Sequence, residues 1–289
     1  MKRLVALGAS SLFTCALALS PALAEDVAAA PEAAAEAAPE PAAEAPAEAP
    51  AAEAPAGPAT VEEFAAEADR LWGVRDATFA GKNNTLHTEL LEKALEKHPG
   101  EFELLWRMAR IYWWRADVSP DEKTKSAWGK KAMEKGDEAR ALQPKRVEGH
   151  YFAAIGTGAW SQGMGIAKAL WKGLEGKFNE RLDTAIGIDS SFDCGGPNNA
   201  KGRYFDELPW PKHDFDKSIE WLNKTIAICP KNPRTHLFLA DAYHKEGKDE
   251  EAKKHLEIAL KSTRAGFPQD PGAVGIVVKW AKDRQKDWK

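Results

Sequence analysis

The segment 159–163, Ala-Trp-Ser-Gln-Gly, is similar to the nucleophile motif of hydrolases. In that motif a serine lies between two glycines at a sharp turn after a β-strand, and the turn exposes its hydroxyl to the substrate. Here alanine replaces the first glycine and no strand-like pattern precedes the serine. The wider segment 156–165 is as glycine-rich as a phosphate-binding loop, but it lacks the strand and the Gly-Lys-Ser/Thr ending. We therefore interpret this region as a helix whose small residues allow close packing or a bend.

The histidines form no recognisable metal or catalytic motif. All seven are scattered along the chain, and none belongs to a His-Glu-x-x-His pattern. His236 and His244 are eight residues apart and could share one face of a helix, although such a pair is more often an exposed surface feature. The sequence predicts no catalytic residue, no metal site and no cofactor, and it favours a protein that is not an enzyme.

Two cysteines, Cys194 and Cys229, lie beyond the N-terminal region, and neither belongs to a Cys-x-x-Cys motif. In an oxidising compartment they can form a disulfide, whose loop of about 35 residues would stabilise the fold by roughly 4 kcal/mol in the chain-entropy model. The alternative is a pair of buried free thiols. The residue pattern does not decide between these two states.

The N-terminal segment 1–24 has the three parts of a secretory signal peptide. A basic start at Lys2 and Arg3 precedes a mostly apolar stretch, and Ala-Leu-Ala at 22–24 forms a cleavage site. The residues before Cys15 are poor for lipidation, so lipoprotein anchoring through this cysteine is the less favoured alternative. These features fit bacterial export, and we expect a periplasmic protein. No later stretch approaches the ~20 apolar residues of a membrane span.

The segment 25–58 consists almost only of alanine, proline and acidic residues. Its eight acidic residues and the absence of basic or aromatic ones predict a disordered linker, which acts either as a solubilising spacer or as a tether across the envelope. The remaining residues, 59–289, form the predicted folded domain, with 38 basic and 36 acidic residues. This near neutrality argues against nucleic acid or an anionic membrane surface as a partner.

From Thr60 onward, apolar residues recur every three or four positions, and no segment alternates with the period of a strand. The domain is therefore predicted to be all-α, with Thr60 as the N-cap of its first helix. Helices are expected to end near Pro99, Pro144, Ser190 and Pro230, at intervals of 45, 46 and 40 residues. Intervals of this length indicate a repeat protein built from helix pairs.

The last unit, residues 233–266, has the spacing of a tetratricopeptide repeat (TPR). Ala240, Ala252 and Ala259 are 12 and then 7 residues apart, which places small side chains where the two helices of a repeat cross. The predicted fold is a TPR-like helical-hairpin solenoid of about five helix pairs, plus a C-terminal helix over about 272–286.

The earlier units match the TPR spacing less well. Their crossing positions lie further apart, which we attribute to longer first helices or longer turns. His87 and Phe178 also occupy positions where a small residue is expected. These two crossings must therefore be wider or differently packed.

The concave side of a TPR array is lined by the first helix of each repeat, and we expect a binding groove there. All 11 tryptophans lie within residues 59–289, and some of them are expected in this groove. With Ala109, Ala154, Gly202 and Ala240 as crossing points, the groove is aromatic at one end and charged at the other. The groove-facing residues are Trp106, Arg110, Trp113, Tyr151, Ile155, Asn199, Arg203, Asp206, Leu237, Asp241 and His244. In the alternative, the longer early helices cover these aromatic side chains themselves.

Several short motifs resemble the TPR-containing T component of tripartite ATP-independent periplasmic (TRAP) transporters. They are Glu-Gly-His-Tyr-Phe at 148–152, the glycine-rich segment around Trp160, Leu-Asp-Thr-Ala-Ile at 182–186, Cys-Gly-Gly-Pro at 194–197, Gly-Arg-Tyr-Phe at 202–205, Leu-Pro-Trp at 208–210 and the segment 232–240. The resemblance implies an all-helical TPR-like body with a ligand-accepting pore or cleft, and association with a periplasmic solute-binding protein. The long linker and the poor lipidation site depart from the family pattern.

Residues 105–110, Leu-Trp-Arg-Met-Ala-Arg, are similar to eukaryotic regulators of microtubule dynamics, a context that the predicted signal peptide argues against. We therefore expect a non-enzymatic periplasmic protein that binds a partner protein and a small hydrophobic or carboxylate ligand. The alternative is a general envelope scaffold with no transport role. The sequence leaves open whether the chain forms a homo-oligomer.

Overall fold

The computed structural model describes residues 57–288, and every regular element in this range is a helix. The predicted all-α fold is therefore confirmed. The predicted signal peptide, and the linker up to residue 56, lie outside the described residues. Within 57–288, none of the helices combines the length and the apolar character that crossing a membrane requires.

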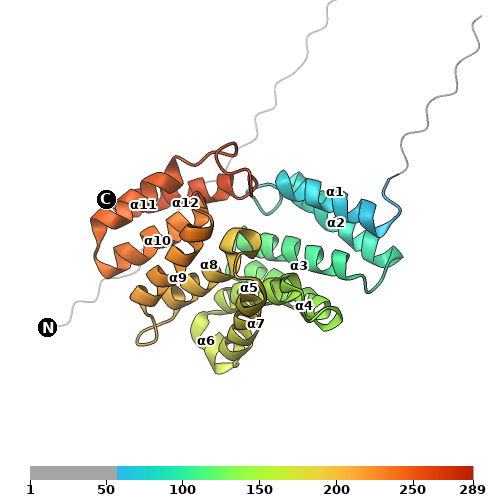
Figure 1. Ribbon diagram of the computed structural model, residues 1–289, viewed down its shortest axis with the longest axis horizontal. Helices are drawn as coiled ribbons and strands as arrows, with labels where there is room; N and C mark the ends of the chain where they lie inside the picture. Colours follow the sequence, from blue (N-terminus) through green and yellow to red (C-terminus); the bar gives the residue numbers. More distant parts are fainter. Residues whose placement is uncertain (1–56, 289) are drawn as a thin grey trace, which may run out of the picture. The chain divides into compact units, whose positions relative to one another are not determined.

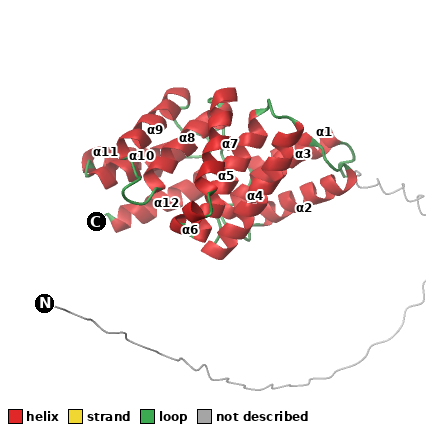
Figure 2. Cartoon of the chain, turned by 90° about the horizontal axis from the view of Figure 1, so that it is seen from below, coloured by secondary structure: helices red, strands yellow, loops and turns green. Residues whose placement is uncertain are grey.

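Five consecutive helix pairs, one short inserted helix and one final helix make up the described range (Figures 1 and 2). The pairs are α1 (Val61–Gly73) with α2 (Lys82–Lys97), α3 (Phe102–Asp117) with α4 (Glu122–Leu142), α5 (Val147–Met164) with α7 (Leu174–Asp189), α8 (Phe192–Glu207) with α9 (Phe215–Ile228), and α10 (Pro233–Glu246) with α11 (Asp249–Leu260). The inserted helix is α6 (Ile166–Trp171), and the final one is α12 (Val274–Asp287). The helices of each pair contact one another, and successive pairs are also in contact. The predicted solenoid of five pairs and a C-terminal helix is thus confirmed.

The helix ends follow the sequence signals closely. Helices α2, α4 and α9 each end two residues before a proline, namely Pro99, Pro144 and Pro230, because the residue that precedes a proline is disfavoured in a helix. At the start of α1, the Thr60 hydroxyl accepts a hydrogen bond from the Glu63 N–H at 3.2 Å, and the Glu63 carboxylate accepts one from the Thr60 N–H at 3.1 Å. These two bonds form a capping box, which confirms the predicted N-cap.

The extra residues of the middle units lie in three different places. In the second unit the second helix, α4, is the long one, with 21 residues. In the third unit α6 is inserted between the paired helices, and in the fourth the loop 208–214 separates α8 from α9. The prediction of longer first helices or turns is therefore wrong for the second unit, where the second helix is the longer one. Extra residues at the N-terminus of α4 increase the spacing between the two crossing positions just as a longer first helix or turn would.

Glycines bring α4 and α5 into backbone contact. Gly129 and Gly136 on α4, and Gly149, Gly156 and Gly163 on α5, recur every seven residues, which is close to two helical turns. A Cβ atom at Gly136 would approach the backbone nitrogen of Ala153 to 2.5 Å, and one at Gly156 would approach that of Met133 to 2.5 Å. This glycine seam confirms that segment 156–165 begins in a closely packed helix rather than a phosphate-binding loop.

Aromatic rings fill the two crossings that lack a small residue. His87 is fully buried and meets the Trp72 ring edge-on at 6.4 Å. Neither of its ring nitrogens has a hydrogen-bond partner within residues 57–288, and burial, followed by the positive charge of Arg110, lowers its pKa to about 3. Phe178 stacks on Tyr204 at 5.4 Å. A ring keeps two helix axes further apart than alanine does.

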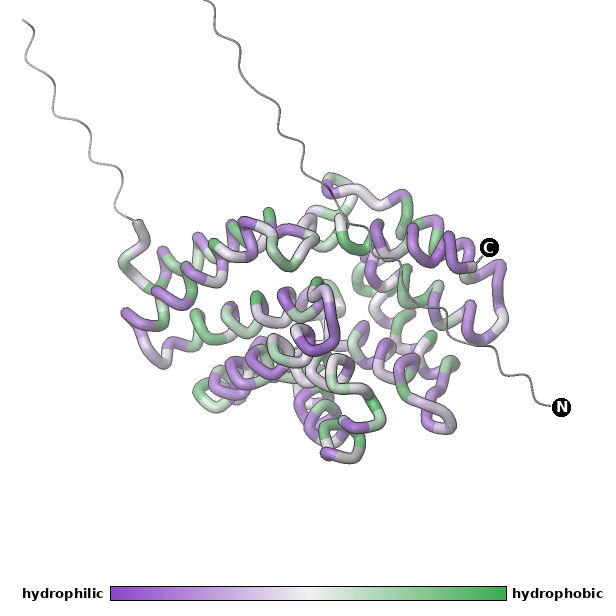
Figure 3. Tube along the Cα trace, turned by 180° about the vertical axis from the view of Figure 1, so that it is seen from behind, coloured by the Kyte–Doolittle hydropathy of each residue, from purple (hydrophilic) through white to green (hydrophobic). Residues whose placement is uncertain are grey.

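The largest apolar core joins the two ends of the array. It contains Phe64 and Leu104 from the early helices together with Leu237, Ile276 and Val277 from α10 and α12. Apolar and polar residues succeed one another along the trace in Figure 3, and apolar side chains of α1–α4 and α10–α12 meet in this core. The chain therefore curves until side chains of its first and last helices belong to one buried core.

The glycine seam generates a stability prediction. The substitution Gly156→Ala should lower the free energy of unfolding by about 3 kcal/mol, because the new methyl group must push α4 away from α5. The matched control is Gly187→Ala on α7, where an added Cβ meets no atom within 4 Å. That variant should be as stable as wild type or about 0.5–1 kcal/mol more stable, because alanine favours the helix. Urea unfolding measures both values, and equal effects of the two substitutions would contradict the seam.

Candidate ligand-binding cavity

A cavity of ≈620 Å³ lies on the inner side of the array. Side chains from α3, α5, α6, α7, α8, α10 and α12 line it, together with Lys125 of α4, the end of α1 and the loops before α4, α10 and α12. This volume falls in the range of small-molecule sites, which are concave and mostly apolar with a few polar groups.

The part of the wall formed by α5, α6 and α7 is mainly apolar. Its apolar lining side chains are Ile155, Ala159, Ile166, Ala169, Leu170, Leu174 and Phe178, and the polar side chains of Tyr151, Ser161, Gln162 and Glu175 also line it. Tyr204 on α8 continues this surface and is fixed by a hydrogen bond to the Glu175 carboxylate at 2.7 Å. This region can hold a hydrocarbon body but offers little to orient a charged group.

Arg234 provides a charged group where α3, α10 and α12 meet. Its guanidinium donates to the Asp117 carboxylate at 2.8 Å and lies near the rings of Trp113 and Trp280, at 5.4 and 5.1 Å. Burial works to lower the pKa of Arg234, but Asp117 outweighs this effect and raises it, so the side chain stays charged. The remaining Arg234 donors have no partner among residues 57–288 and are not closed off from the cavity.

Arg203, a second arginine that lines the cavity, forms ion pairs with three acidic side chains. It donates to Asp206 at 2.6 Å and to Asp241 at 3.0 Å, and it also pairs with Glu207. Arg284 on α12 donates to the same Asp241 at 3.1 Å. Asp241 therefore links α8, α10 and α12, and Arg203 is neutralised before any ligand enters.

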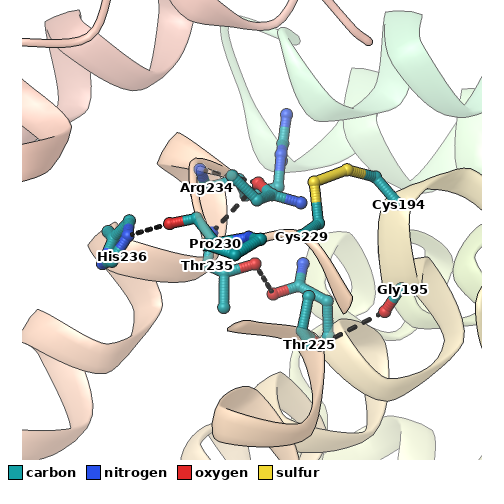
Figure 4. Close-up of a disulfide and its surroundings, with 10 residues drawn as sticks. Cys194, Gly195, Thr225, Cys229, Pro230, Arg234, Thr235 and His236 are labelled. Atoms are coloured by element: carbon teal, nitrogen blue, oxygen red, sulfur yellow. Dashed lines mark hydrogen bonds between the residues drawn. A yellow bond between two sulfur atoms is a disulfide. The ribbon is translucent and has the colours of Figure 1, made fainter. Parts of the chain in front are cut away.

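Asp193 reaches the cavity from an unusual backbone. Asp193 and Cys194 both have left-handed dihedrals, with φ of 51° and 58°, and Gly195 follows with φ of 77°. The structure joins Cys194 to Cys229 in a disulfide with the Cα atoms 5.5 Å apart, and Thr225 donates to the Gly195 carbonyl at 3.2 Å (Figure 4). These links hold the start of α8 against the end of α9.

Tyr151 lies beside Asp193 at the bottom of the cavity. Its phenol is buried, and burial together with the charge of Asp193 raises its pKa well above the usual value. The same burial, together with the charge of Asp270, raises the pKa of Asp193, whereas Arg110 and Arg75 oppose that rise. Tyr151 is therefore a neutral hydrogen-bonding group at neutral pH.

A buried ion pair closes the cavity between the two ends of the chain. Arg75 in the α1–α2 loop donates to Asp270 in the loop before α12 at 2.7 Å, and a second oxygen of Asp270 lies 2.6 Å from Arg75. The Arg75 guanidinium lies over Trp72 at 3.6 Å and over Trp114 at 4.2 Å. Arg75 has no exposed surface, so its charge depends mainly on Asp270, with a smaller contribution from Asp193.

The structure brings five of the predicted groove residues to the cavity. They are Trp113, Tyr151, Ile155, Asn199 and Arg203. They come from α3, α5 and α8, whose inner faces are where the repeat spacing predicts them.

The other six predicted groove residues do not line the cavity. Trp106 stacks on Phe152 at 5.9 Å, His244 stacks on Trp288 at 4.2 Å, and Leu237 is in the core. The three charged residues form ion pairs instead. Arg110 pairs with Asp69 at 2.5 Å, Asp206 binds Arg203 and Lys245, and Asp241 binds Arg203 and Arg284. For α10 the physical reason is α12, which packs across the face that would otherwise be concave. The repeat spacing therefore predicts groove-facing residues only on helices whose inner face is not covered by a later helix.

Sequence reasoning missed several cavity residues. They include Trp72, Asp117, Asp193, Arg234, Phe238, Asp270 and Trp280. Arg234 and Phe238 are four residues apart and share the uncovered face of α10, which is a signal that the helical period contains. Asp193 had no such signal, because its position depends on three successive left-handed residues.

His236 and His244, considered as a pair in the sequence, do not meet. His236 instead lies 2.9 Å from His255 between ring nitrogens and contacts the Pro230 carbonyl at 2.9 Å, as Figure 4 shows for Pro230. Within residues 57–288, no group of three or more His, Cys, Asp or Glu side chains has an arrangement that could hold a metal ion.

Stacked helix pairs around an inner cavity define the class of this protein, a TPR-like helical array. The thermophilic TPR protein TTC0263 from Thermus thermophilus has a similar structure, with a TM-score of 0.55 and 18% identity over 76% of this chain and 97% of that one. A monomeric IFIT1 mutant with a capped m7Gppp-AAAA oligonucleotide gives a TM-score of 0.53 and 16% identity over 78% of this chain and 47% of that one. MamA gives a TM-score of 0.40 and 21% identity over 62% of this chain and 88% of that one. At these identities the likeness concerns the fold.

In sequence, the family described as regulator of microtubule dynamics protein 1-3 matches residues 66–192. This stretch is less than half of the chain and runs from α1 into the start of α8. A search of curated proteins gives no significant match.

The closing ion pair generates a second stability prediction. The substitution Asp270→Asn should lower the free energy of unfolding by about 3 kcal/mol, because it removes the carboxylate that forms the salt bridge with the buried Arg75. As a control, Glu250→Gln removes an exposed pair with Lys253 and should change stability by less than about 0.5 kcal/mol. Thermal and urea unfolding of the three proteins provide the comparison. If both substitutions had the same small effect, Arg75 and Asp270 would not hold the ends of the array together.

Proposed function

We propose that this chain is a binding protein whose inner cavity holds a small amphipathic carboxylate. The observation that carries the proposal is the combination of Arg234 donors that remain open and an apolar wall within one ≈620 Å³ cavity. A hydrocarbon body would lie along α5, α6 and α7, and the carboxylate would bind to Arg234.

Arg234 suits a carboxylate for geometric reasons. A guanidinium is planar and presents paired donors that match the two oxygens of a carboxylate. Asp117 occupies one edge of the guanidinium and fixes its orientation. Trp113 and Trp280 flank it with their rings, and a charge pair beside such apolar groups is stronger than one in water.

We further propose that the chain acts in the periplasm with a solute-binding protein as its partner. The motifs that resemble the T component of TRAP transporters support this role, and a cavity in a TPR-like array agrees with the ligand-accepting cleft that the resemblance implies. In the alternative, the array is a general envelope scaffold, and the cavity is a by-product of the curvature that lets the ends meet.

Binding of octanoate tests the ligand proposal. The fluorescence of the cavity tryptophans should change saturably on titration of the mature chain with octanoate, and Arg234→Gln should weaken binding at least tenfold, as expected for a lost charge-assisted hydrogen bond. Arg234→Lys should fall between the two, because lysine keeps the charge but not the paired donors.

The matched control is Arg264→Gln, which alters an exposed arginine outside the cavity and should leave octanoate affinity unchanged. Melting curves confirm that each variant is folded. If octanoate does not bind to the wild-type chain, or binds equally well to Arg234→Gln, the carboxylate proposal is wrong.

Capture from a periplasmic extract tests the partner proposal. The exported chain should begin at Glu25 by mass spectrometry, since cleavage is expected after Ala24. Crosslinking should then recover a solute-binding protein in a stoichiometric complex. A chain that recovers only other envelope proteins would favour the scaffold alternative, whereas a chain that keeps residues 1–24 would contradict the expected export in both readings.

A further inference from the structure

Asp193 differs from the other carboxylates of the cavity in having no salt-bridge partner within residues 57–288. The other four lining acids each have a basic partner: Asp117 pairs with Arg234, Glu175 with Lys212, Glu207 with Arg203, and Asp270 with Arg75. Asp193 lines the same cavity, is exposed to it, and forms no salt bridge within residues 57–288. Arg110 and Arg75 act to lower the pKa of Asp193 without forming a salt bridge to it within residues 57–288, and a cation bound directly to the carboxylate would stabilise its charged form further.

The backbone at Asp193 is held in a conformation that a side chain normally avoids. A left-handed residue with a Cβ atom costs roughly 1–2 kcal/mol, and two such residues, Asp193 and Cys194, follow one another here. The Cys194–Cys229 disulfide and the hydrogen bond from the Gly195 N–H to the Ser191 carbonyl, at 3.0 Å, maintain the strain. Strain of this kind concentrates at ligand-binding positions.

Asp193 and Arg234 lie at the same end of the cavity. Cys194, the neighbour of Asp193, is bonded to Cys229, and the turn from Cys229 leads directly into the first residues of α10, where Arg234 lies (Figure 4). Both charged groups also act on the buried phenol of Tyr151. An anionic and a cationic group therefore face the same space.

We infer that the ligand is zwitterionic, with an ammonium group bound by Asp193 next to the carboxylate bound by Arg234, as in an apolar α-amino acid. This inference rests on the proposed function and adds the second charge of the head group. Tyr151 would contribute a neutral hydrogen-bonding group between the two charges. The pairing leaves the cavity with no uncompensated carboxylate, whereas a plain carboxylate would leave Asp193 as it is.

Two probes that differ only in the amino group test the inference. Octanoate and 2-aminooctanoate have the same carbon chain, and calorimetric titration of the mature chain gives both dissociation constants. We expect 2-aminooctanoate to bind at least about tenfold more tightly than octanoate, which is the effect of one charge-assisted hydrogen bond. In Asp193→Asn the two probes should bind equally tightly, because the variant keeps the shape of the side chain but removes the negative charge. Its affinity for octanoate should be higher than that of wild type or lower by no more than about twofold.

Asparagine adopts the left-handed conformation as readily as aspartate, so Asp193→Asn should fold normally, and its melting temperature verifies this. The control Asp216→Asn changes an exposed aspartate on α9 and should preserve the tenfold ratio. If octanoate binds and 2-aminooctanoate binds no more tightly, or if Asp193→Asn keeps the ratio, the zwitterion inference is wrong while the carboxylate proposal stands. If neither probe binds, the proposed function itself fails and the inference falls with it.

Discussion

The close contact between α4 and α5 is the constraint on which the cavity depends. Glycines repeated every seven residues on both helices let the two backbones touch, and any side chain there would separate them. Helix α5 also contacts α3, α7 and α8, so the seam fixes the position of the central helix of the array. Tyr151 is two residues from Gly149, about 200° further around the helix, and therefore faces away from α4 toward the cavity.

Two long-range links lie at the cavity and connect the helices around it. The Arg75–Asp270 pair joins the loops at the two ends of the array, and the shared core below it contains side chains from both α1 and α12. The Cys194–Cys229 disulfide holds α8 to the end of α9. An open TPR superhelix offers a groove to an extended partner, whereas closure at the ends produces a bounded space suited to a small molecule.

The electrostatics of the enclosure are almost balanced within the protein. Arg203, Arg284 and the acids around them satisfy one another, which stabilises the packing of α8, α10 and α12 but leaves nothing for a ligand. Among the described residues, the open donors of Arg234 and the carboxylate of Asp193, which forms no salt bridge, remain for a ligand, and Lys125 adds a further cation at the lining. Recognition of a ligand would therefore depend on these groups and on the shape of the apolar wall.

The sequence alone determined the class of fold, the number of helix pairs and most helix ends, because helical periodicity, prolines and small crossing residues are local signals. It also placed Tyr151, Ile155, Asn199 and Arg203 on inner faces. Only the tertiary structure decided that α12 covers Leu237 and Asp241, and that Arg75 meets Asp270 across 195 residues of chain. The left-handed turn that brings Asp193 to the cavity likewise depends on packing between distant helices. Periodicity specifies which side of a helix is apolar, but not which distant segment finally covers it.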